Sequence, residues 1–272
     1  MSRQGADPPL TDREAVPVRY RARVEYDGTD FVGFQVNPGR RTVQGVLEDA
    51  LARLGDGQRQ RIDGAGRTDA GVHATGQVIA FPYDGRLAAT DLGRAFDALL
   101  PEDVAVRDVR QAPTGFHPRF AARYREYRYT VWNGPRSPLR ERQALGVRVP
   151  LDTAAMALAG SVFIGRHDFR AFGVADRSTV RTVNSVRVRS EGRLLTIDVR
   201  ADAFLRGQVR RMVAALLEVG LGTADEAAVR VAMVAQGPAF GGVAAPAKGL
   251  CLRRVAYGRR IGGDTNGEHE ER

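Results

Sequence analysis

The stretch VRYRARVEY, residues 18–26, alternates strictly between two kinds of side chain. Its even-numbered positions hold valine, tyrosine or alanine, and its odd-numbered positions hold arginine or glutamate. Because successive side chains of a strand point to opposite faces, this period of two predicts a half-buried β-strand with its charged residues on the other face.

The elements that follow this strand complete a unit over residues 18–112. Thr42 is placed to cap a helix with an apolar stripe as far as Leu54, and Thr90 to cap a second helix that ends at Leu100. Further strands are expected at residues 60–63, 77–81 and 103–111. The resulting order, βαββαβ, is the split arrangement of ferredoxin-like units.

Residues 113–261 repeat this order without repeating the sequence. Strands are expected at residues 124–132, 179–190, 194–201 and 250–257, and helices at 152–164, 205–220 and 225–235. We therefore expect an α+β protein of two ferredoxin-like (βαββαβ) halves, with mainly antiparallel sheets flanking a basic central cleft. Residues 1–17 and the acidic residues 262–272 are expected to be flexible tails.

The charge balance points to a polyanionic partner. The chain has 272 residues and a net charge of +9, and all of its 41 basic residues except Lys248 are arginine. Residues 18–261 carry 38 basic and 25 acidic residues, a net charge of +13. A GC-rich genome would explain the choice of arginine over lysine but not the net positive charge, so nucleic acid is the first candidate partner.

Other features exclude several classes of protein. Cys251 is the only cysteine, so an intramolecular disulfide is impossible and a cysteine zinc site is not expected. The four histidines are too far apart along the chain to give a metal-ligand spacing. Residues 1–17 lack the apolar segment of a signal peptide, and the apolar stretches are too short to span a bilayer. We expect a cytoplasmic protein with no metal and no membrane segment.

The loop GAGRTDAGVHATG, residues 64–76, is the first candidate for chemistry. Its glycines allow positive φ and the close approach of a ligand. Asp69 stands where a dinucleotide-binding loop would need its third glycine, and its carboxylate would repel a pyrophosphate. A charged residue in such a loop can be a reactive carboxylate, but loop aspartates more often cap turns. The residues alone leave both roles open.

Two further segments combine arginine with features that suit RNA binding. FHPRFAARYREYRY, residues 116–129, interleaves aromatic side chains, which stack on unpaired bases, with arginines, which bind phosphate. FLRGQVRRM, residues 204–212, places arginines at the start of a helix, where anions already bind well. A strand with a solvated basic face and a plain solvated helix are the alternatives. The candidates for substrate binding in these segments are Arg119, Arg123 and Arg206.

GRTDAGVHATGQV, residues 66–78, closely resembles the signature of the tRNA pseudouridine synthase A family. Four other segments match the family in the same order, and the resemblance spans roughly residues 18–258. They are EYDGTDFVGFQ (25–35), VQGVLE (43–48), the basic segment 116–129, and 204–213 together with GLCL (249–252). The thirteen-residue loop is highly specific, and the collinear order of the others makes a coincidence improbable.

The resemblance implies a homodimeric isomerase that needs no cofactor. Such enzymes convert uridine to pseudouridine at nucleotides 38, 39 and 40, in the anticodon stem-loop of tRNA. The family has two α+β halves around a basic cleft, which agrees with the duplicated order of elements. Departures from the family pattern, such as Phe34 for tryptophan, Gly207-Gln208 for His-Met and Cys251 for tyrosine, concern packing and tRNA contacts.

The resemblance also implies roles for individual residues. Asp69 matches the essential aspartate, which either attacks the ribose or the uracil or abstracts a ribose proton. Arg67 matches the arginine that helps to extrude the target nucleotide, a step that costs a few kcal/mol. Tyr127 matches the tyrosine that stacks on the flipped uracil and assists removal of its C5 proton. Arg210 matches the arginine paired with the aspartate, and Leu250 matches an apolar residue of the uracil pocket.

Two rival functions belong to other classes. A non-catalytic RNA-binding protein of two RRM-like units would suit the basic halves, but the chain contains no RNP1-like run of glycine and aromatic residues. A metal-dependent nuclease would need clustered carboxylates or histidines, whereas the motifs offer one carboxylate.

Overall fold

The computed structural model describes residues 18–174, 178–235 and 237–258. The helices are α1 (Val43–Leu54), α2 (Ala89–Leu99), α3 (Thr153–Ser161), α4 (Gln208–Gly220) and α5 (Glu226–Val234). The strands are β1 (Arg19–Tyr26), β2 (Asp63–Gly64), β3 (His73–Pro82), β4 (Val104–Gln111), β5 (Ala122–Asn133), β6 (Leu145–Val147), β7 (Gly165–Asp168), β8 (Val180–Glu191), β9 (Leu194–Ala201) and β10 (Leu250–Tyr257). The expected tails, 1–17 and 262–272, lie outside the described residues.

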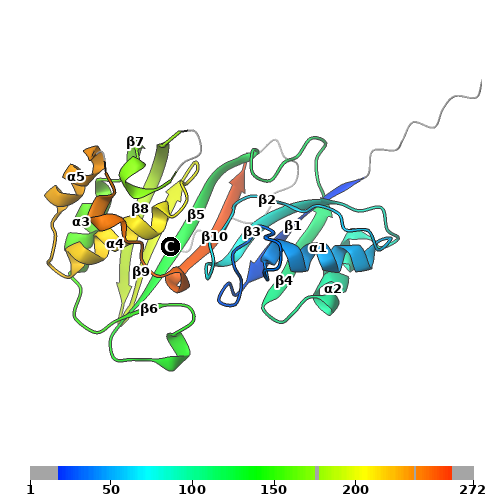
Figure 1. Cartoon of the computed structure of the whole chain (residues 1–272), viewed down its shortest axis with the longest axis horizontal. Helices are drawn as coiled ribbons and strands as arrows, with labels where there is room; N and C mark the ends of the chain where they lie inside the picture. The colour runs from blue at the N-terminus through cyan, green and yellow to red at the C-terminus, as the bar shows by residue number, and fades with distance from the viewer. Residues whose placement is uncertain (1–17, 175–177, 236, 259–272) are drawn as a thin grey trace, which may run out of the picture.

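One continuous sheet of ten strands forms the frame of the protein. Its order is β4-β1-β3-β10-β5-β9-β8-β7, with β2 paired to β3 and β6 paired to β5. The strands are antiparallel except at the β3–β10 and β5–β6 pairs. The two halves of the chain lie side by side along the long axis, and the long strands β5 and β10 run between them (Figure 1).

The expectation of separate sheets in the two halves is therefore wrong. β10 pairs with β5 of its own half and also lies parallel to β3, where Cys251 is opposite His73 and Leu252 is opposite Ala74. This junction joins both half-sheets edge to edge and leaves no free edge between them. One hydrophobic cluster contains buried residues from both halves, so the division at residue 112 stays a prediction.

The half-buried first strand is confirmed, with one exception. Ala22, Val24 and Tyr26 are buried, as the alternation predicts. Arg21 was expected on the polar face but is buried, with its guanidinium 5.5 Å from the centre of the Phe116 ring. The register of β1 against β4 shifts between Arg21 and Arg23, and the segment that begins at Phe116 covers this part of the strand.

The helices agree with their apolar patterns but not always with the expected caps. The Thr42 hydroxyl accepts a hydrogen bond from the Gly45 amide, which confirms the first cap. The second helix begins at Ala89, and Thr90 lies inside it. The helix expected from residue 205 begins only at Gln208, because Gly207 has a φ of +72° and ends the preceding turn in a left-handed conformation.

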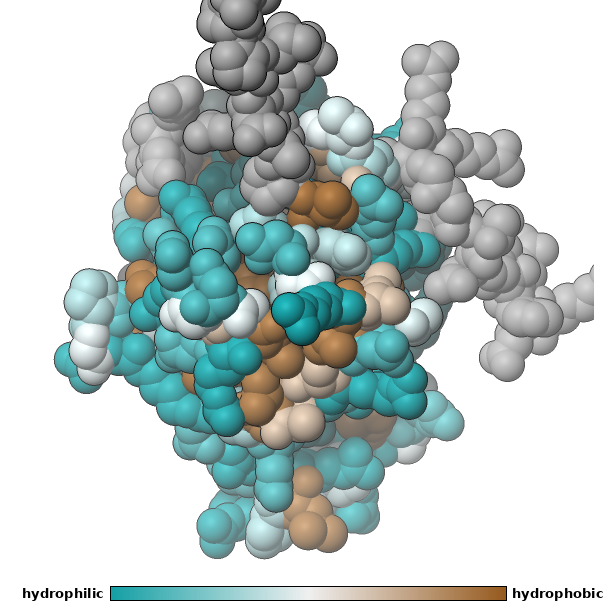
Figure 2. All heavy atoms as spheres, turned by 90° about the vertical axis from the view of Figure 1, so that its right-hand side faces the viewer, coloured by the Kyte–Doolittle hydropathy of each residue, from teal (hydrophilic) through white to brown (hydrophobic). Residues whose placement is uncertain are grey.

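Within the described ranges, no helix is long and apolar enough to cross a bilayer. The end of the molecule formed by the N-terminal half is mostly hydrophilic and has a narrow strip of hydrophobic residues (Figure 2).

Candidate active site

A cavity of about 740 Å³ opens where the two halves meet, and we call it the first cavity. The loop between β2 and β3, the centre of β5, the start of α4 and the first residue of β10 all contribute to its wall. Among the residues that the structure describes, its only acidic lining residue is Asp69. Six arginines line it as well: Arg67, Arg119, Arg125, Arg181, Arg206 and Arg210.

The loop that carries Asp69 is held by buried polar side chains. Gln77 is fully buried on β3, and its amide binds both the N–H and the carbonyl of Gly66, at 3.2 and 2.8 Å. The hydroxyls of Tyr26 and Thr68 are 2.7 Å apart, and burial raises the pKa of the Tyr26 phenol above its ordinary value. The backbone on both sides of Arg67 is therefore fixed, while Arg67 itself is exposed.

Two glycines of the EYDGTDFVGFQ motif let its loop pack against the Asp69 loop. A Cβ atom on Gly28 would lie 2.0 Å from the carbonyl oxygen of Val72. Gly33 has a φ of +90°, and a Cβ atom there would lie 2.9 Å from the carbonyl oxygen of Thr68. Only glycine fits such close approaches, so the two motifs form one structural unit.

Asp69 and Arg210 face each other across the first cavity. Arg210 Nη1 lies 3.7 Å from Asp69 Oδ2, and the two side chains are 23% and 32% exposed. The Arg210 Nε donates a 2.6 Å hydrogen bond to the carbonyl of Ala245, which fixes the guanidinium from behind. Arg210 lies in the first turn of α4, so the positive end of the helix dipole also faces this side of the cavity.

Tyr127 and Leu250 form the apolar part of the cavity wall. Tyr127 is 9% exposed on β5, and its ring meets Phe204 edge-on at 5.3 Å between ring centres. Its hydroxyl lies next to Gly66, where a Cβ atom would be 3.7 Å away. Burial raises the pKa of the Tyr127 phenol well above its ordinary value, so the ring is neutral at physiological pH. Leu250, at the start of β10, is 5% exposed.

The structure brings together seven of the eight residues selected from the sequence. Arg67, Arg119 and Arg206 are exposed at the wall of the cavity that holds Asp69, Tyr127, Arg210 and Leu250. Within the described residues, Arg67 makes no hydrogen bond or ion pair, so its charge is available to a ligand. Arg123 is exposed at the start of β5 but does not line the cavity.

Arg125 and Gln77 are the functional residues that sequence reasoning missed. Arg125 is 8% exposed and donates to the carbonyls of Asp202 at 2.7 Å, Ala65 at 3.1 Å and Arg119. Burial lowers its pKa. It ties β5 to the Asp69 loop, so the solvated basic face expected for this strand is wrong at this position. The signal was its phase, because Arg125 precedes the buried Tyr127 by two residues and therefore lies on the same, buried face of β5.

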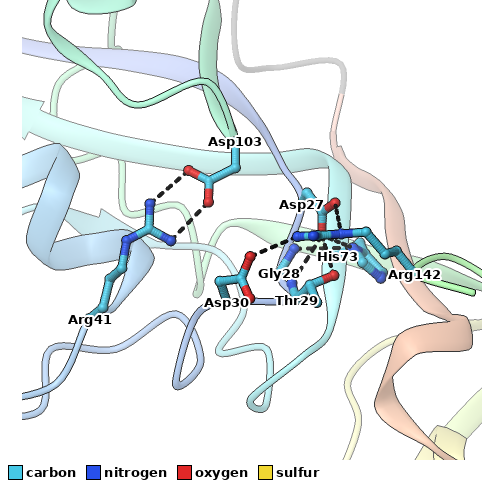
Figure 3. A network of polar contacts seen from close by, with 8 residues as sticks. All are labelled: Asp27, Gly28, Thr29, Asp30, Arg41, His73, Asp103 and Arg142. Carbon is cyan, nitrogen blue, oxygen red and sulfur yellow. Dashed lines mark hydrogen bonds and ion pairs between the residues drawn. The ribbon is translucent and has the colours of Figure 1, made fainter.

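A polar network anchors the far end of the Asp69 loop (Figure 3). The Gly28 amide donates to His73 Nδ1 at 3.0 Å, and His73 Nε2 lies 3.1 Å from the carbonyl of Lys248. Arg142 reaches from the other half of the chain to Asp27 at 3.3 Å and to Asp30 at 2.7 Å. These contacts join the start of β3 to the turn that precedes Leu250.

The described residues contain no group of three or more histidine, cysteine or acidic side chains able to hold a metal ion. What the first cavity offers is one carboxylate beside a guanidinium, a neutral aromatic ring and further arginines at the rim. A carboxylate can act as nucleophile or base, and arginines can bind phosphate. This arrangement is that expected of an enzyme that acts on a nucleic acid.

Comparison with known proteins gives the family. A sequence model described as tRNA pseudouridine synthase matches residues 22–121 and 159–258. A tRNA pseudouridine synthase A from Pelobacter propionicus is 45% identical over 240 residues, which cover 86% of this chain and 97% of the relative. One from Geobacter sulfurreducens is 43% identical over 238 residues, with the same shares covered. One from Geobacillus kaustophilus is 39% identical over 243 residues, covering 88% and 94%.

The chain belongs to the tRNA pseudouridine synthase family, as the resemblance of residues 66–78 implied. It is therefore an isomerase that makes pseudouridine in tRNA. Among solved structures, an H/ACA RNP bound to a substrate RNA containing 2′-deoxyuridine is similar at 13% identity and a TM-score of 0.30, over 73% of this chain and 53% of that chain. That likeness is too weak to support any statement about this protein.

Proposed function

We propose that this isomerase acts on uridines 38, 39 and 40 of the tRNA anticodon stem-loop, with Asp69 as its essential carboxylate. The observation that carries the proposal is the composition of the first cavity, where, among the described residues, Asp69 is the only carboxylate and six arginines surround it. A base in a stem is stacked and out of reach, so the target nucleotide must be flipped into the cavity before it can react.

Each residue of the cavity has a part in this reaction. Arg67, exposed and without a partner among the described residues, enters the space that the target nucleotide leaves. Tyr127 stacks on the flipped uracil, and Leu250 closes the apolar side of the pocket. Arg210 pairs with the Asp69 carboxylate at 3.7 Å and orients it beside the substrate.

The isomerisation breaks the bond between uracil N1 and ribose C1′ and joins C1′ to C5; C5 then loses its proton and N1 takes one up, so that product and substrate are isomers. Asp69 acts on the ribose, the uracil or a ribose proton at the start of this sequence. The raised pKa of Tyr127 keeps its phenol neutral, which favours a stacking role over proton removal by a phenolate. The reaction draws on no metal and no cofactor.

We also propose that each half is a ferredoxin-like unit and that the first cavity is the deepest part of a basic cleft for tRNA. The strand orders support this, since β4-β1-β3-β2 and β10-β5-β9-β8 follow the same pattern when each half is numbered by itself and the short strands β6 and β7 are left out. Arg119 and Arg206 at the wall of the first cavity, and Arg123 outside it, contact phosphates of the tRNA. The enzyme works as a cytoplasmic homodimer.

The test uses synthetic anticodon stem-loops that carry a single uridine at position 38, 39 or 40, or elsewhere in the stem. The protein is incubated with each RNA in EDTA, and nucleosides are separated after digestion. We expect pseudouridine only from the first three RNAs. Product from uridines at any stem position would overturn the assignment to nucleotides 38–40. Cleavage on addition of metal would indicate a nuclease, and tight binding without product would indicate a binding module.

A further inference from the structure

A second cavity, of about 570 Å³, lies beside the first and has no part in the function proposed above. The two cavities share the wall formed by Phe34, Gln35, Val36, Arg67 and Arg119. Beyond that wall the second cavity is lined by side chains from α1, from the segment before β2 and from the segment before β5. A strand of RNA that enters the first cavity therefore has a neighbouring site open to its next nucleotide.

Phe120 presents its ring to solvent at the edge of the second cavity. Its exposure is 77%, which is unusual for a phenylalanine, and it packs against His117 at 4.4 Å between ring centres. The Arg119 guanidinium lies 5.9 Å from the same ring. Stacking a base on this ring would remove apolar surface from water on both partners.

The backbone on both sides of Phe120 is held in place, so the conformation of the turn keeps the Phe120 ring exposed to solvent. Phe116 is 6% exposed and packs against Tyr257 of β10 at 5.2 Å between ring centres. The Tyr257 hydroxyl donates to the carbonyl of Pro118 at 2.9 Å, and the Ala121 amide donates to the carbonyl of His117 at 3.0 Å. The turn is held at both ends while its aromatic tip points outward.

The charges of the second cavity suit a phosphate. Its basic lining residues are Arg59, Arg61, Arg67 and Arg119, and its acidic ones are Glu48 and Asp63.

Both acidic residues already have partners. Glu48 accepts from Gln44 at 2.8 Å, from the Ile62 amide at 3.1 Å and from Arg59 at 3.1 Å. Asp63 pairs with Arg19 at 2.8 Å. The acidic side chains are thus neutralised, whereas Arg61 is 79% exposed and lies 3.6 Å from Asp63 without a hydrogen bond to it.

We propose that the second cavity binds a nucleotide of the RNA strand next to the target uridine, with its unpaired base stacked on Phe120. The phosphate between the two nucleotides lies at the shared wall, by Arg67 and Arg119, and the next phosphate lies by Arg61. A phenylalanine ring offers no hydrogen bond to a base edge, so this subsite accepts any base and prefers purines for their larger stacking area. The inference rests on the proposed function, because it assumes that the first cavity holds the target uridine.

The test uses stem-loops with the fluorescent purine 2-aminopurine on either side of the target uridine. Stacking on an aromatic ring quenches this base. We compare the wild type with Phe120→Ala, Phe120→Trp and Leu139→Ala, the last a control that removes a 97% exposed apolar side chain outside both cavities. Phe120 and Leu139 are both on the surface, so the melting temperatures of the three variants should equal that of the wild type.

We expect the wild type and Phe120→Trp to quench 2-aminopurine on one side of the target, and Phe120→Ala to lose the quenching. Affinity of Phe120→Ala should fall about 10-fold, within the range for loss of one stacked base. Its single-turnover rate at saturating enzyme should stay within about twofold of wild type, because the ring lies outside the first cavity. Leu139→Ala should behave as wild type.

Two failures are distinguishable in this design. If the wild type forms pseudouridine but Phe120→Ala binds and quenches like wild type, the subsite is refuted and the proposed function stands. If the wild type forms no pseudouridine in any stem-loop, the proposed function fails, and with it the assignment of the subsite to a neighbour of the target.

Discussion

The two sides of the first cavity are built in different ways. The side from the N-terminal half is a loop, residues 65–72, and its backbone is held by buried side chains such as Gln77 and Tyr26. The side from the C-terminal half consists of regular elements, with Tyr127 inside β5 and Arg210 in the first turn of α4. The reactive carboxylate thus lies on the irregular side and its partner on the regular side.

This difference determines which property a substitution should change. The conformation of a loop that has no regular backbone hydrogen bonds depends on a few buried polar side chains. When one of these side chains is lost, the loop residues bound to it move. A side chain on a helix or strand is placed by many backbone hydrogen bonds, so loss of one contact costs stability before it changes geometry. Substitutions on the loop side should therefore affect the reaction first, and substitutions on the regular side should affect stability first.

The largest effect is expected from Asp69→Asn on the loop side. The change is nearly isosteric and leaves the contacts of Gln77 and Tyr26 intact, so the melting temperature should stay within a few degrees. Pseudouridine formation in single turnover should fall below detection, because the only carboxylate that the described residues place in the first cavity is lost. Affinity for the stem-loop should persist or rise, since a negative charge has left the neighbourhood of a polyanion and Arg210 is released.

Asp103→Asn is the matched control for this prediction. Asp103 is also a partly exposed carboxylate of the N-terminal half and pairs with Arg41 at 2.8 Å, outside the first cavity. Its substitution should leave the rate unchanged. If Asp69→Asn lost stability and kept activity, Asp69 would be a turn cap and the mechanism would be wrong.

The next largest effect is expected when two buried glutamines are substituted, Gln77 on the loop side of the first cavity and Gln208 on the regular side. Gln77→Leu leaves the N–H and carbonyl of Gly66 without a partner, at a cost of about 1–3 kcal/mol in the free energy of unfolding. We expect its single-turnover rate to fall at least about tenfold under conditions where the protein is fully folded, because Arg67 and Asp69 are next to the released peptide.

Gln208→Leu removes the bond between Gln208 Oε1 and the Leu205 amide, 2.8 Å long, at the start of α4. It should lower stability by a similar amount and keep most of the rate, because the helix still places Arg210. Denaturant unfolding and product formation on the same preparations give both quantities. If Gln77→Leu and Gln208→Leu lost the same share of the single-turnover rate, the expected difference between the loop side and the regular side of the first cavity would be wrong.

Local signals predicted most of the fold. The alternation of residues 18–26 and the apolar stripe of α1 gave elements with nearly correct ends, and β10 has the bounds expected for it. The start of β3 was missed because His73 to Gly76 contains a glycine and turn-forming residues, and its pairing with β10 joins segments far apart in the chain. β7 has only four residues, too few for a period to be seen.

The candidate site was predictable in part. Asp69, Tyr127 and Arg210 were identified by resemblance to a family motif, since nothing in a single aspartate distinguishes a reactive carboxylate from a turn cap. Arg125 could have been selected only from its place on the buried face of β5, and Gln77 could not be selected, because the sequence does not show the tertiary partners of a polar side chain in a strand. Their partners, Gly66 and Ala65, belong to a loop that has no periodic pattern.

A smaller effect separates the ring of Tyr127 from its hydroxyl. Tyr127→Phe keeps the edge-on contact with Phe204 and a stacking face, so its rate should stay within about tenfold of wild type. Tyr127→Leu loses the ring, and the reactive conformer should weaken by about 1–3 kcal/mol. Because burial raises the pKa of this phenol, deprotonation of Tyr127 should not appear in the wild-type pH–rate profile below about pH 10. An alkaline limb that is present in wild type and absent from Tyr127→Phe would show that the phenol takes part in proton transfer.

The smallest effect concerns two arginines at different distances from the first cavity. Arg206 is exposed at the cavity wall, next to the start of α4, whereas Arg123 is exposed at the start of β5 and does not line the cavity. Binding of the stem-loop should weaken steeply with salt, since each phosphate contact contributes about 0.7–0.9 to the slope of log affinity against log salt. Arg206→Ala should lower that slope by about the contribution of one phosphate contact. Arg123→Ala should lower it by less, although both variants remove one positive charge. Affinities measured between low and physiological salt test this difference. Equal slopes for the two variants would mean that net charge, and not the position of the arginine at the cavity, governs the binding of tRNA.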